Sequence, residues 1–327
     1  MLNTNNYLLK VDNLKTYFPI KKGLLQRTTG FIKAVDGISF GIKTGQTLGL
    51  VGESGCGKTT VARTIVRLTP ATAGRITFQQ MDVLLADRVK LRRLRKDISL
   101  IFQDPFGSLN PRMTIGNIIG EPLKVHRAAA GSKLTEQVAT LLRKVGLAPD
   151  YMNRYPHQFS AGQRQRIGIA RALALEPKLI ICDEPVSSLD VSVQSQILNL
   201  LKDLQQALGL TYLFIAHDLA VVEFFCDFVA VMYMGKIVEQ ATAAELYRNP
   251  IHPYTHALIS AIPQIGSRAQ RRKEAIINDL PSVSNQLAGC VFGQRCRWRQ
   301  NKCLSQMPAL KERSEHKGHF VACWKCK

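Results

Sequence analysis

The stretch that decides the fold is Gly52-Glu-Ser-Gly-Cys-Gly57-Lys58-Thr59. It follows a short apolar run, Thr47 to Val51, and precedes Thr59 to Leu68, which has the pattern of a helix. Glycines in such a loop let backbone N–H groups curl around phosphate oxygens, and the next helix points the positive end of its dipole at them. The sequence therefore predicts a strand, a phosphate-binding loop and a helix. Lys58 is expected to neutralise phosphate oxygens, and the Thr59 hydroxyl to bind Mg²⁺.

A second motif ends another apolar run. Leu179-Ile-Ile-Cys182 predicts a buried parallel strand, and Asp183 and Glu184 follow it directly. A carboxylate at such a strand end can hold Mg²⁺, usually through water, and the next can orient or deprotonate an attacking water. The alternative without catalysis is an acidic pair at the start of a helix, where it interacts favourably with the positive end of the helix dipole. Such acidic pairs are common in isolation, so these two residues alone leave both interpretations open.

Three further features are weak evidence for function when each is considered alone. Gln103 follows Ile101-Phe102, and His217 ends the apolar run Thr211 to Ala216. Phe159-Ser-Ala-Gly-Gln-Arg-Gln-Arg166 opens a predicted helix over residues 161–175. Taken singly, residues of these kinds are most often a surface glutamine, a structural histidine and an ordinary helix cap.

In their order, these five elements resemble the ATP-binding cassette (ABC) ATPases over about residues 8–245. The resemblance implies an α/β P-loop NTPase with a RecA-like core, an antiparallel β subdomain and an inserted helical subdomain at about 105–175. It also implies that Glu184 is the catalytic base and that Gln103 and His217 assist it. Ser160 would face the γ-phosphate bound by a second cassette. Ala161 departs from the family, which usually has glycine there.

The residues that the resemblance assigns to nucleotide and metal fall into two sets. The nucleotide-binding set is Tyr17, Gly52, Glu53, Ser54, Gly55, Cys56, Gly57, Lys58, Thr59, Thr60, Gln103, Ser160, Ala161, Gly162, Gln163, Asp183 and Asp190. The Mg²⁺ set is Thr59, Gln103 and Asp183. Tyr17 or its neighbour Phe18 would stack under adenine, and stacking on an aromatic face is physically sensible.

The flanking segments complete the organisation. Residues 7–51 are predicted to be strands around a polar loop from Lys21 to Gly30, and residues 112–157 mainly helices. Thr135 to Val145 and Gln194 to Leu208 are expected helices, and Phe228 to Glu239 a hairpin around Gly235. Residues 1–248 form the predicted ATPase domain, and 249–327 a C-terminal extension. No second phosphate loop is present, so the chain carries one cassette.

The bulk composition sets limits. The chain has 327 residues, is 46% hydrophobic and has a formal charge of +20. That charge favours anionic partners such as nucleotide, nucleic acid or an anionic membrane face. No apolar run reaches the length of a membrane helix, and no secretory signal is evident. We expect a peripheral protein at the cytoplasmic face of the inner membrane.

The extension narrows the resemblance. Asn249-Pro-Ile-His-Pro-Tyr-Thr-His-Ala-Leu resembles the C-terminal extension of oligopeptide, dipeptide and nickel importer ATPases, above all the second ATPase subunit of dipeptide importers. By this resemblance Cys290, Cys296, Cys303 and Cys323 hold a [4Fe–4S] cluster, and Cys326 is spare. Zn²⁺ is the alternative. No substrate site is expected near these cysteines, so their simplest role is to staple a small segment.

The resemblance also implies partners. These are a second, paralogous cassette subunit, two transmembrane permease subunits and an extracytoplasmic substrate-binding protein that acts through them. The expected function is ATP-driven uptake of di- or oligopeptides, with nickel or other chelates as the alternative cargo. A soluble cassette ATPase acting on nucleic acid is the second alternative. It is disfavoured because such relatives generally carry two cassettes, so no nucleic-acid partner is expected.

Overall fold

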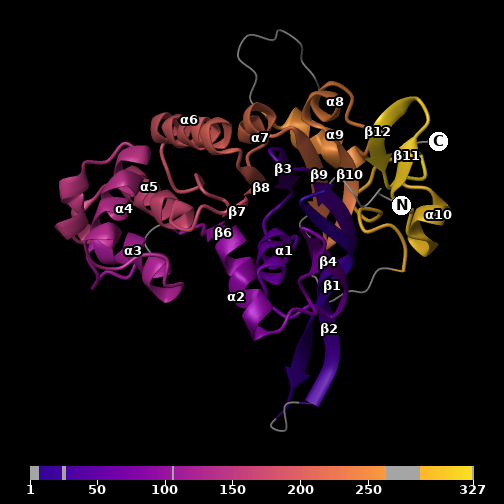
Figure 1. Ribbon diagram of the computed structural model, residues 1–327. Helices are drawn as coiled ribbons and strands as arrows, with labels where there is room; N and C mark the ends of the chain where they lie inside the picture. Colours follow the sequence, from indigo (N-terminus) through magenta and orange to yellow (C-terminus); the bar gives the residue numbers. More distant parts are fainter. Residues whose placement is uncertain (1–6, 24–26, 105–106, 263–287, 326–327) are drawn as a thin grey trace. The chain divides into compact units, whose positions relative to one another are not determined.

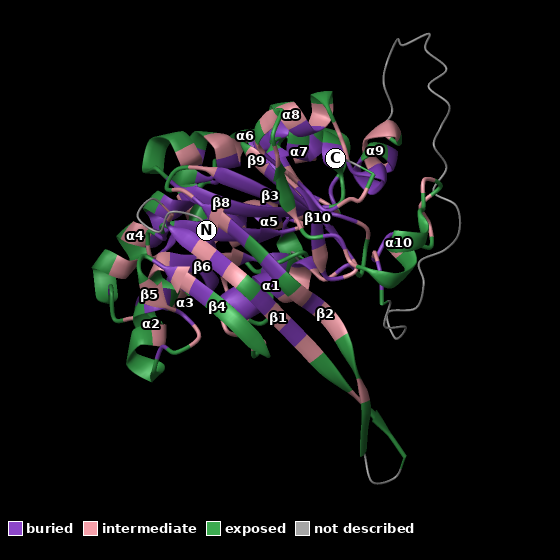
Figure 2. Cartoon of the chain, turned by 90° about the vertical axis from the view of Figure 1, so that its right-hand side faces the viewer, coloured by how far each residue is buried: buried purple, intermediate pink, exposed green. Residues whose placement is uncertain are grey.

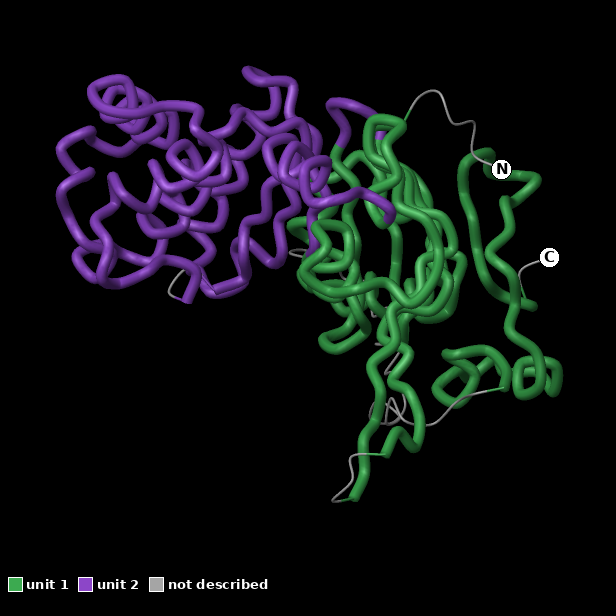
Figure 3. The backbone as a smooth tube through the Cα atoms, turned by 60° about the horizontal axis from the view of Figure 1, so that its bottom comes forward, with its two compact units in different colours: residues 1–42, 47–84, 216–327 green, residues 43–46, 85–215 purple. Residues whose placement is uncertain are grey.

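The computed structural model describes residues 7–23, 27–104, 107–262 and 288–325. Two compact units divide the chain (Figure 3). The first contains the described residues of 1–42, 47–84 and 216–327, and the second those of 43–46 and 85–215. Each unit draws on segments that are distant in sequence.

In the first unit, one sheet is wholly antiparallel. Its strands are β1 (Leu9–Lys22), β2 (Arg27–Ile42), β4 (Ala73–Phe78) and β5 (Met81–Asp82), in the order β2-β1-β4-β5. The expected loop from Lys21 to Gly30 was too long, because Lys21 pairs with Thr28 and Ile20 with Gly30. Two strands can continue their backbone pairing into solvent without an apolar face. Figure 2 shows this: the hairpin is buried at its base and exposed toward its tip.

The same unit holds the strand that leads to the phosphate loop. β3 (Thr47–Val51) is completely buried and runs parallel to β9 (Phe228–Tyr233). β10 (Lys236–Thr242) pairs antiparallel with β9, which confirms the predicted hairpin. Its turn residues Met234 and Gly235 have φ values of 43° and 81°.

The C-terminal segment adds to this sheet. β12 (His316–Val321) pairs with β10, and β11 (Lys311–Arg313) pairs with β12 (Figure 1, yellow). The helices of this unit are α1 (Lys58–Ile65), α7 (Leu219–Phe225), α8 (Ala243–Arg248), α9 (Pro253–Ser260) and α10 (Asn301–Ser305).

The second unit has parallel strands and most of the long helices. β6 (Ile98–Ile101), β7 (Leu179–Asp183) and β8 (Thr211–Ala216) lie side by side in parallel. β7 and β8 are buried at every position, as their continuous apolar sequences predicted. The helices are α2 (Arg88–Asp97), α3 (Ile115–Val125), α4 (Gly131–Lys144), α5 (Ala161–Leu173) and α6 (Val191–Leu208), with 3₁₀ turns η2 (Pro149–Asn153) and η3 (Pro156–Gln158).

The predicted helices are confirmed; α5 begins at Ala161 as expected, and α1, α4 and α6 begin earlier than expected. α6 begins at Val191 rather than Gln194, because the Asp190 carboxylate accepts the Val193 N–H at 2.9 Å and caps the helix. Gly209, with a φ of 65°, ends it. Among the helices within the described ranges, none is both long and apolar enough to cross a membrane.

Candidate nucleotide site

The phosphate-binding loop connects β3 to α1 and depends on two glycines. A Cβ on Gly52 would lie 2.1 Å from the Met232 carbonyl oxygen, and one on Gly57 would lie 2.1 Å from that of Ala34. Gly57 also has a φ of 109° and stands directly before α1. Ser54 and Gly55 are exposed at the outer side of the loop. The loop therefore packs against β9 and β2 at its ends and opens to solvent at its middle.

Lys58 is held inside this loop. Its side chain is nearly buried, and Nζ donates to the carbonyl oxygens of Gly52 at 2.7 Å and Glu53 at 3.0 Å. Thr59 and Thr60 follow in the first turn of α1 and are half-buried. Cys56 is buried beside Lys58, and burial raises the pKa of its thiol. The structure thus places one cation and the start of a helix where a phosphate group would bind.

The loop geometry predicts the effect of Gly57→Ala. Its methyl group would overlap the Ala34 carbonyl and occupy a left-handed backbone conformation, so we expect a loss of about 2 kcal/mol or more in the free energy of unfolding. Gly55→Ala is the matched control, because its φ is also positive, at 79°, but no atom lies within 4 Å of the added Cβ. Urea unfolding of both variants measures the difference. Equal losses would contradict the steric argument.

Tyr17 is fixed by a short polar chain. Its hydroxyl donates to Asp36 at 2.5 Å, and Asp36 forms an ion pair with Lys236 at 2.9 Å. Burial and the bond to Asp36 raise the Tyr17 pKa to about 12. Phe18, the alternative adenine contact, is 40% exposed and points to the other side of β1 by strand alternation. Both residues remain candidates.

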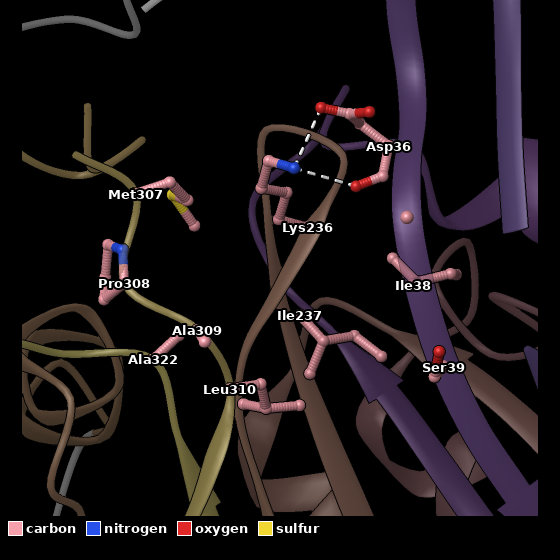
Figure 4. Close-up of a pocket in the computed structure, with 11 residues that line it drawn as sticks. Asp36, Ile38, Ser39, Lys236, Ile237, Met307, Pro308, Ala309, Leu310 and Ala322 are labelled. Atoms are coloured by element: carbon pink, nitrogen blue, oxygen red, sulfur yellow. Dashed lines mark hydrogen bonds and ion pairs between the residues drawn. The ribbon is translucent and has the colours of Figure 1, made fainter. Parts of the chain in front are cut away.

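Asp36 and Lys236 also line a pocket of about 390 Å³ (Figure 4). Its other walls come from Gly37 to Ser39, Ile237, Ala322 and the segment Met307 to Leu310 of the C-terminal extension. The pocket is largely apolar away from the ion pair, which Figure 4 shows at one end.

The predicted catalytic carboxylate meets the predicted glutamine. Gln103 Nε2 donates to Glu184 Oε2 at 2.8 Å. Glu184 has a φ of 48°, and its N–H donates to the Ile215 carbonyl at 2.9 Å. Asp183, immediately before it, ends β7 and is buried. The geometry therefore gives the Glu184 carboxylate a fixed direction at the end of the parallel strands. His217, predicted to assist it, is exposed directly after β8.

The segment Phe159 to Gln163 forms a reciprocal helix cap at the start of α5. The Ser160 hydroxyl accepts the Gln163 N–H at 3.3 Å, and Gln163 Oε1 accepts the Ser160 N–H at 3.0 Å. As an acceptor in this cap, Ser160 can still donate its own hydrogen to an anion. A Cβ on Gly162 would lie 2.5 Å from Val193 Cγ1, so this glycine allows α5 to pack closely on α6. Ala161 beside it is half-exposed.

Two residues of the C-terminal extension touch the phosphate loop, and neither was expected from the sequence. Arg295 makes two hydrogen bonds to the Glu53 carboxylate, at 2.8 and 3.1 Å. The Tyr254 hydroxyl accepts the Glu53 N–H at 2.8 Å. The expectation that no substrate site lies near these cysteines stays a prediction, but Arg295, which directly precedes Cys296, does bring this segment into contact with the phosphate loop. The His-Pro-Tyr stretch was a signal for Tyr254, but the resemblance gave it no role.

The four predicted cysteine ligands lie in one region. Burial raises the Cys290 pKa to about 11, and electrostatic repulsion from Cys303, Cys323 and Cys296 adds to this effect. Backbone N–H groups of Phe292 and Trp298 bond to the sulfurs of Cys290 and Cys296 and favour their thiolate forms. Over the described part of the chain, no three or more His, Cys, Asp or Glu side chains are close enough together to hold a metal ion. Cys326 lies outside the described residues.

Comparisons with known proteins show the family of the chain. A family model described as "ABC transporter" matches residues 35–187, and one described as "oligopeptide/dipeptide transporter, C-terminal region" matches residues 238–303. The oligopeptide transport ATP-binding protein AppF of Bacillus subtilis (strain 168) is 51% identical over 97% of this chain and 96% of its own length. OppF of Haemophilus influenzae, with the same description, is 48% identical over 99% and 98%.

Solved structures give the same fold. The dimeric, post-hydrolysis state of the ATP-binding cassette MJ0796 bound to ADP and Pi has a TM-score of 0.64 and 28% identity, covering 72% of this chain and 98% of that one. CbiO1 from Clostridium perfringens, part of the ABC transporter complex cbiONQ, has a TM-score of 0.63 and covers 75% and 92% at 28% identity. The chain belongs to the family of ABC transporter ATPases that carry the oligopeptide/dipeptide transporter C-terminal region.

Proposed function

We propose that this protein is the ATP-hydrolysing motor subunit of a peptide importer. The observation that supports this most strongly is the likeness, over nearly the whole chain, to oligopeptide transport ATP-binding proteins. Nickel or another chelate is the alternative cargo. The domain division at residues 248 and 249 remains part of the proposal.

The residues divide the chemistry as follows. The loop from Gly52 to Thr59 binds the phosphates of ATP, with Lys58 opposite the β- and γ-phosphates and Tyr17 under adenine. Glu184 accepts a proton from the attacking water, and Gln103 holds its carboxylate in place. His217 contacts the γ-phosphate.

The proposed Mg²⁺ ligands fit a hard cation. Thr59, Gln103 and Asp183 provide only oxygen donors, and Mg²⁺ prefers oxygen. Bound there, it would neutralise charge on the phosphate oxygens. A second cassette completes the nucleotide-binding site, and its residues equivalent to Ser160 and Asp190 face the nucleotide. That second subunit is proposed to be a paralogue.

The remaining partners are two permease subunits and an extracytoplasmic binding protein that acts through them, which places the chain at the cytoplasmic face of the inner membrane. Affinity purification of the tagged chain from detergent-solubilised native membranes tests this. We expect a second cassette subunit and two integral membrane subunits to co-purify, and liposomes containing the complex to take up peptides only with ATP. Recovery of nucleic acid that dissociates at high salt, without any membrane subunit, would contradict the importer function and favour the nucleic-acid alternative.

We also propose that Cys290, Cys296, Cys303 and Cys323 hold a [4Fe–4S] cluster. The backbone N–H bonds to the sulfurs of Cys290 and Cys296 support thiolate ligation, because they favour the charged form of each sulfur. Zn²⁺ is the alternative, since it also binds thiolates. Either group would fasten a segment with little core of its own.

Cys296→Ser tests the ligand set. After anaerobic purification we expect it to lose most bound iron and sulfide, or zinc, because a serine hydroxyl is a poor ligand for these groups. Metal and sulfide analysis measures this, and Cys326→Ser, outside the ligand set, is the control. Full metal content in Cys296→Ser would remove it from the set.

A further inference from the structure

Every polar group of Glu53, in the phosphate loop, takes part in a hydrogen bond. Its N–H donates to the Tyr254 hydroxyl, and its carboxylate receives the two Arg295 bonds. Its carbonyl oxygen accepts from Lys58 Nζ at 3.0 Å. A continuous chain of contacts therefore runs from the C-terminal extension, through Glu53, to the lysine that meets the phosphates.

Arg295 is firmly placed for this contact. Only 8% of its side chain is exposed, and its guanidinium also donates to the Tyr233 hydroxyl at 3.2 Å. Burial alone would lower the Arg295 pKa, but the bonds to Glu53 and Tyr233 raise it above its usual value. A two-bond arginine–carboxylate pair fixes direction as well as charge. The pair thus restrains the Glu53 side chain rather than only neutralising it.

Tyr254 is equally well fixed. Its ring packs edge-on against Tyr233 with centroids 4.6 Å apart and lies 5.5 Å from Phe292, which precedes Arg295 by three residues. At the start of α9, His252 Nδ1 accepts the Tyr254 N–H. Burial lowers the His252 pKa to about 4, which keeps that nitrogen able to accept.

A buried carboxylate joins these parts. Glu239 of β10 accepts the N–H groups of Ile251 and His252 and bonds to His319 Nε2 at 2.7 Å. The rings and this carboxylate therefore hold α9 and β12 to the sheet that carries the loop.

We propose that Arg295 and Tyr254 are positioning residues for the phosphate-binding loop, through which the C-terminal extension sets the affinity for ATP. They act in two ways. They fix Glu53 so that its carbonyl keeps the Lys58 ammonium in place, and preorganisation of this kind raises affinity. Arg295 also neutralises a carboxylate that would otherwise repel the phosphates of the nucleotide. The proposal rests on the nucleotide site proposed above.

The test is nucleotide binding to the full-length chain with a fluorescent ATP analogue, together with steady-state ATPase kinetics. Arg295→Ala is expected to raise Kd and KM for ATP roughly tenfold, the scale of one charge-assisted contact. Because neither residue touches the reacting atoms, kcat at saturating ATP should change less than twofold. Tyr254→Phe, which keeps the ring packing, should raise Kd by a smaller factor. It also keeps the proposal testable if Arg295→Ala does not fold.

A double-mutant cycle distinguishes a positioning role of Arg295 from a general effect on the structure. In the Glu53→Gln background, Arg295→Ala should raise Kd by a smaller factor than in the wild-type chain, because the charge that Arg295 neutralised is gone and only its positioning bond remains to be lost. Arg299→Ala, which removes the same charge from an exposed site in the same segment, should bind like the wild-type chain. An unchanged Kd in both Arg295→Ala and Tyr254→Phe, or an equal loss in Arg299→Ala, would overturn the proposal. A wild-type chain that bound no nucleotide would contradict the proposed site itself.

Discussion

Glu184→Gln is expected to lower steady-state ATP hydrolysis by roughly a hundredfold to ten-thousandfold, the usual contribution of a general base, while ATP binding is retained. The amide has nearly the same shape and can still accept the bond from Gln103. It cannot accept a proton from the attacking water. Since binding depends on the separate loop from Gly52 to Thr59, the variant should hold ATP and accumulate in the ATP-bound state.

The chain offers a closely matched control. Glu176 also precedes a proline, is exposed, and has a φ of 52°, close to the 48° of Glu184. Glu176→Gln should therefore share any backbone or charge effect and keep full activity. Phosphate release measures turnover, and a binding titration measures affinity. Normal turnover in Glu184→Gln would refute its assignment as the base, and loss of binding together with turnover would indicate misfolding.

The local parts of the fold were predictable because their signals are local. A short, completely apolar run such as Leu179 to Cys182 is typical of a strand that is covered on both faces of a sheet, and it forms the buried strand β7. Gly235 predicted a hairpin because a tight turn needs a positive φ, and the turn lies there. The phosphate loop combines both signals, since an apolar strand leads into glycines that pack against neighbouring backbone.

The contacts between distant residues were not predictable in the same way. Glu53 and Arg295 are 242 positions apart, and the place of Arg295 directly before Cys296, among 44 basic residues, does not indicate its partner. The proximity of Gln103 and Glu184 was implied only by family resemblance, because neither spacing nor periodicity brings them together. The hairpin β1–β2 was underestimated because charged residues such as Lys21 normally indicate a loop, yet strand pairing tolerates them in solvent.

Lys58→Ala is expected to weaken ATP binding roughly 10- to 100-fold, the scale of a hydrogen bond to a charged group. The ammonium is the cation that the loop encloses, and its bonds to Gly52 and Glu53 hold it there. Alanine removes that charge and leaves two carbonyl oxygens without this donor. Those oxygens would then present negative potential to an anionic ligand.

A control variant and the steady-state kinetics separate the contact of Lys58 with phosphate from a general effect of net charge. Lys22→Ala removes a lysine from the exposed end of β1 and should leave Kd unchanged, so that the effect of net charge is measured separately. Unchanged affinity in Lys58→Ala would refute the phosphate-loop assignment. Because phosphoryl transfer builds charge that Lys58 neutralises, its loss should also lower kcat. Arg295→Ala should raise KM with little change in kcat. This difference separates a residue that contacts the phosphates from one that only positions the loop around them.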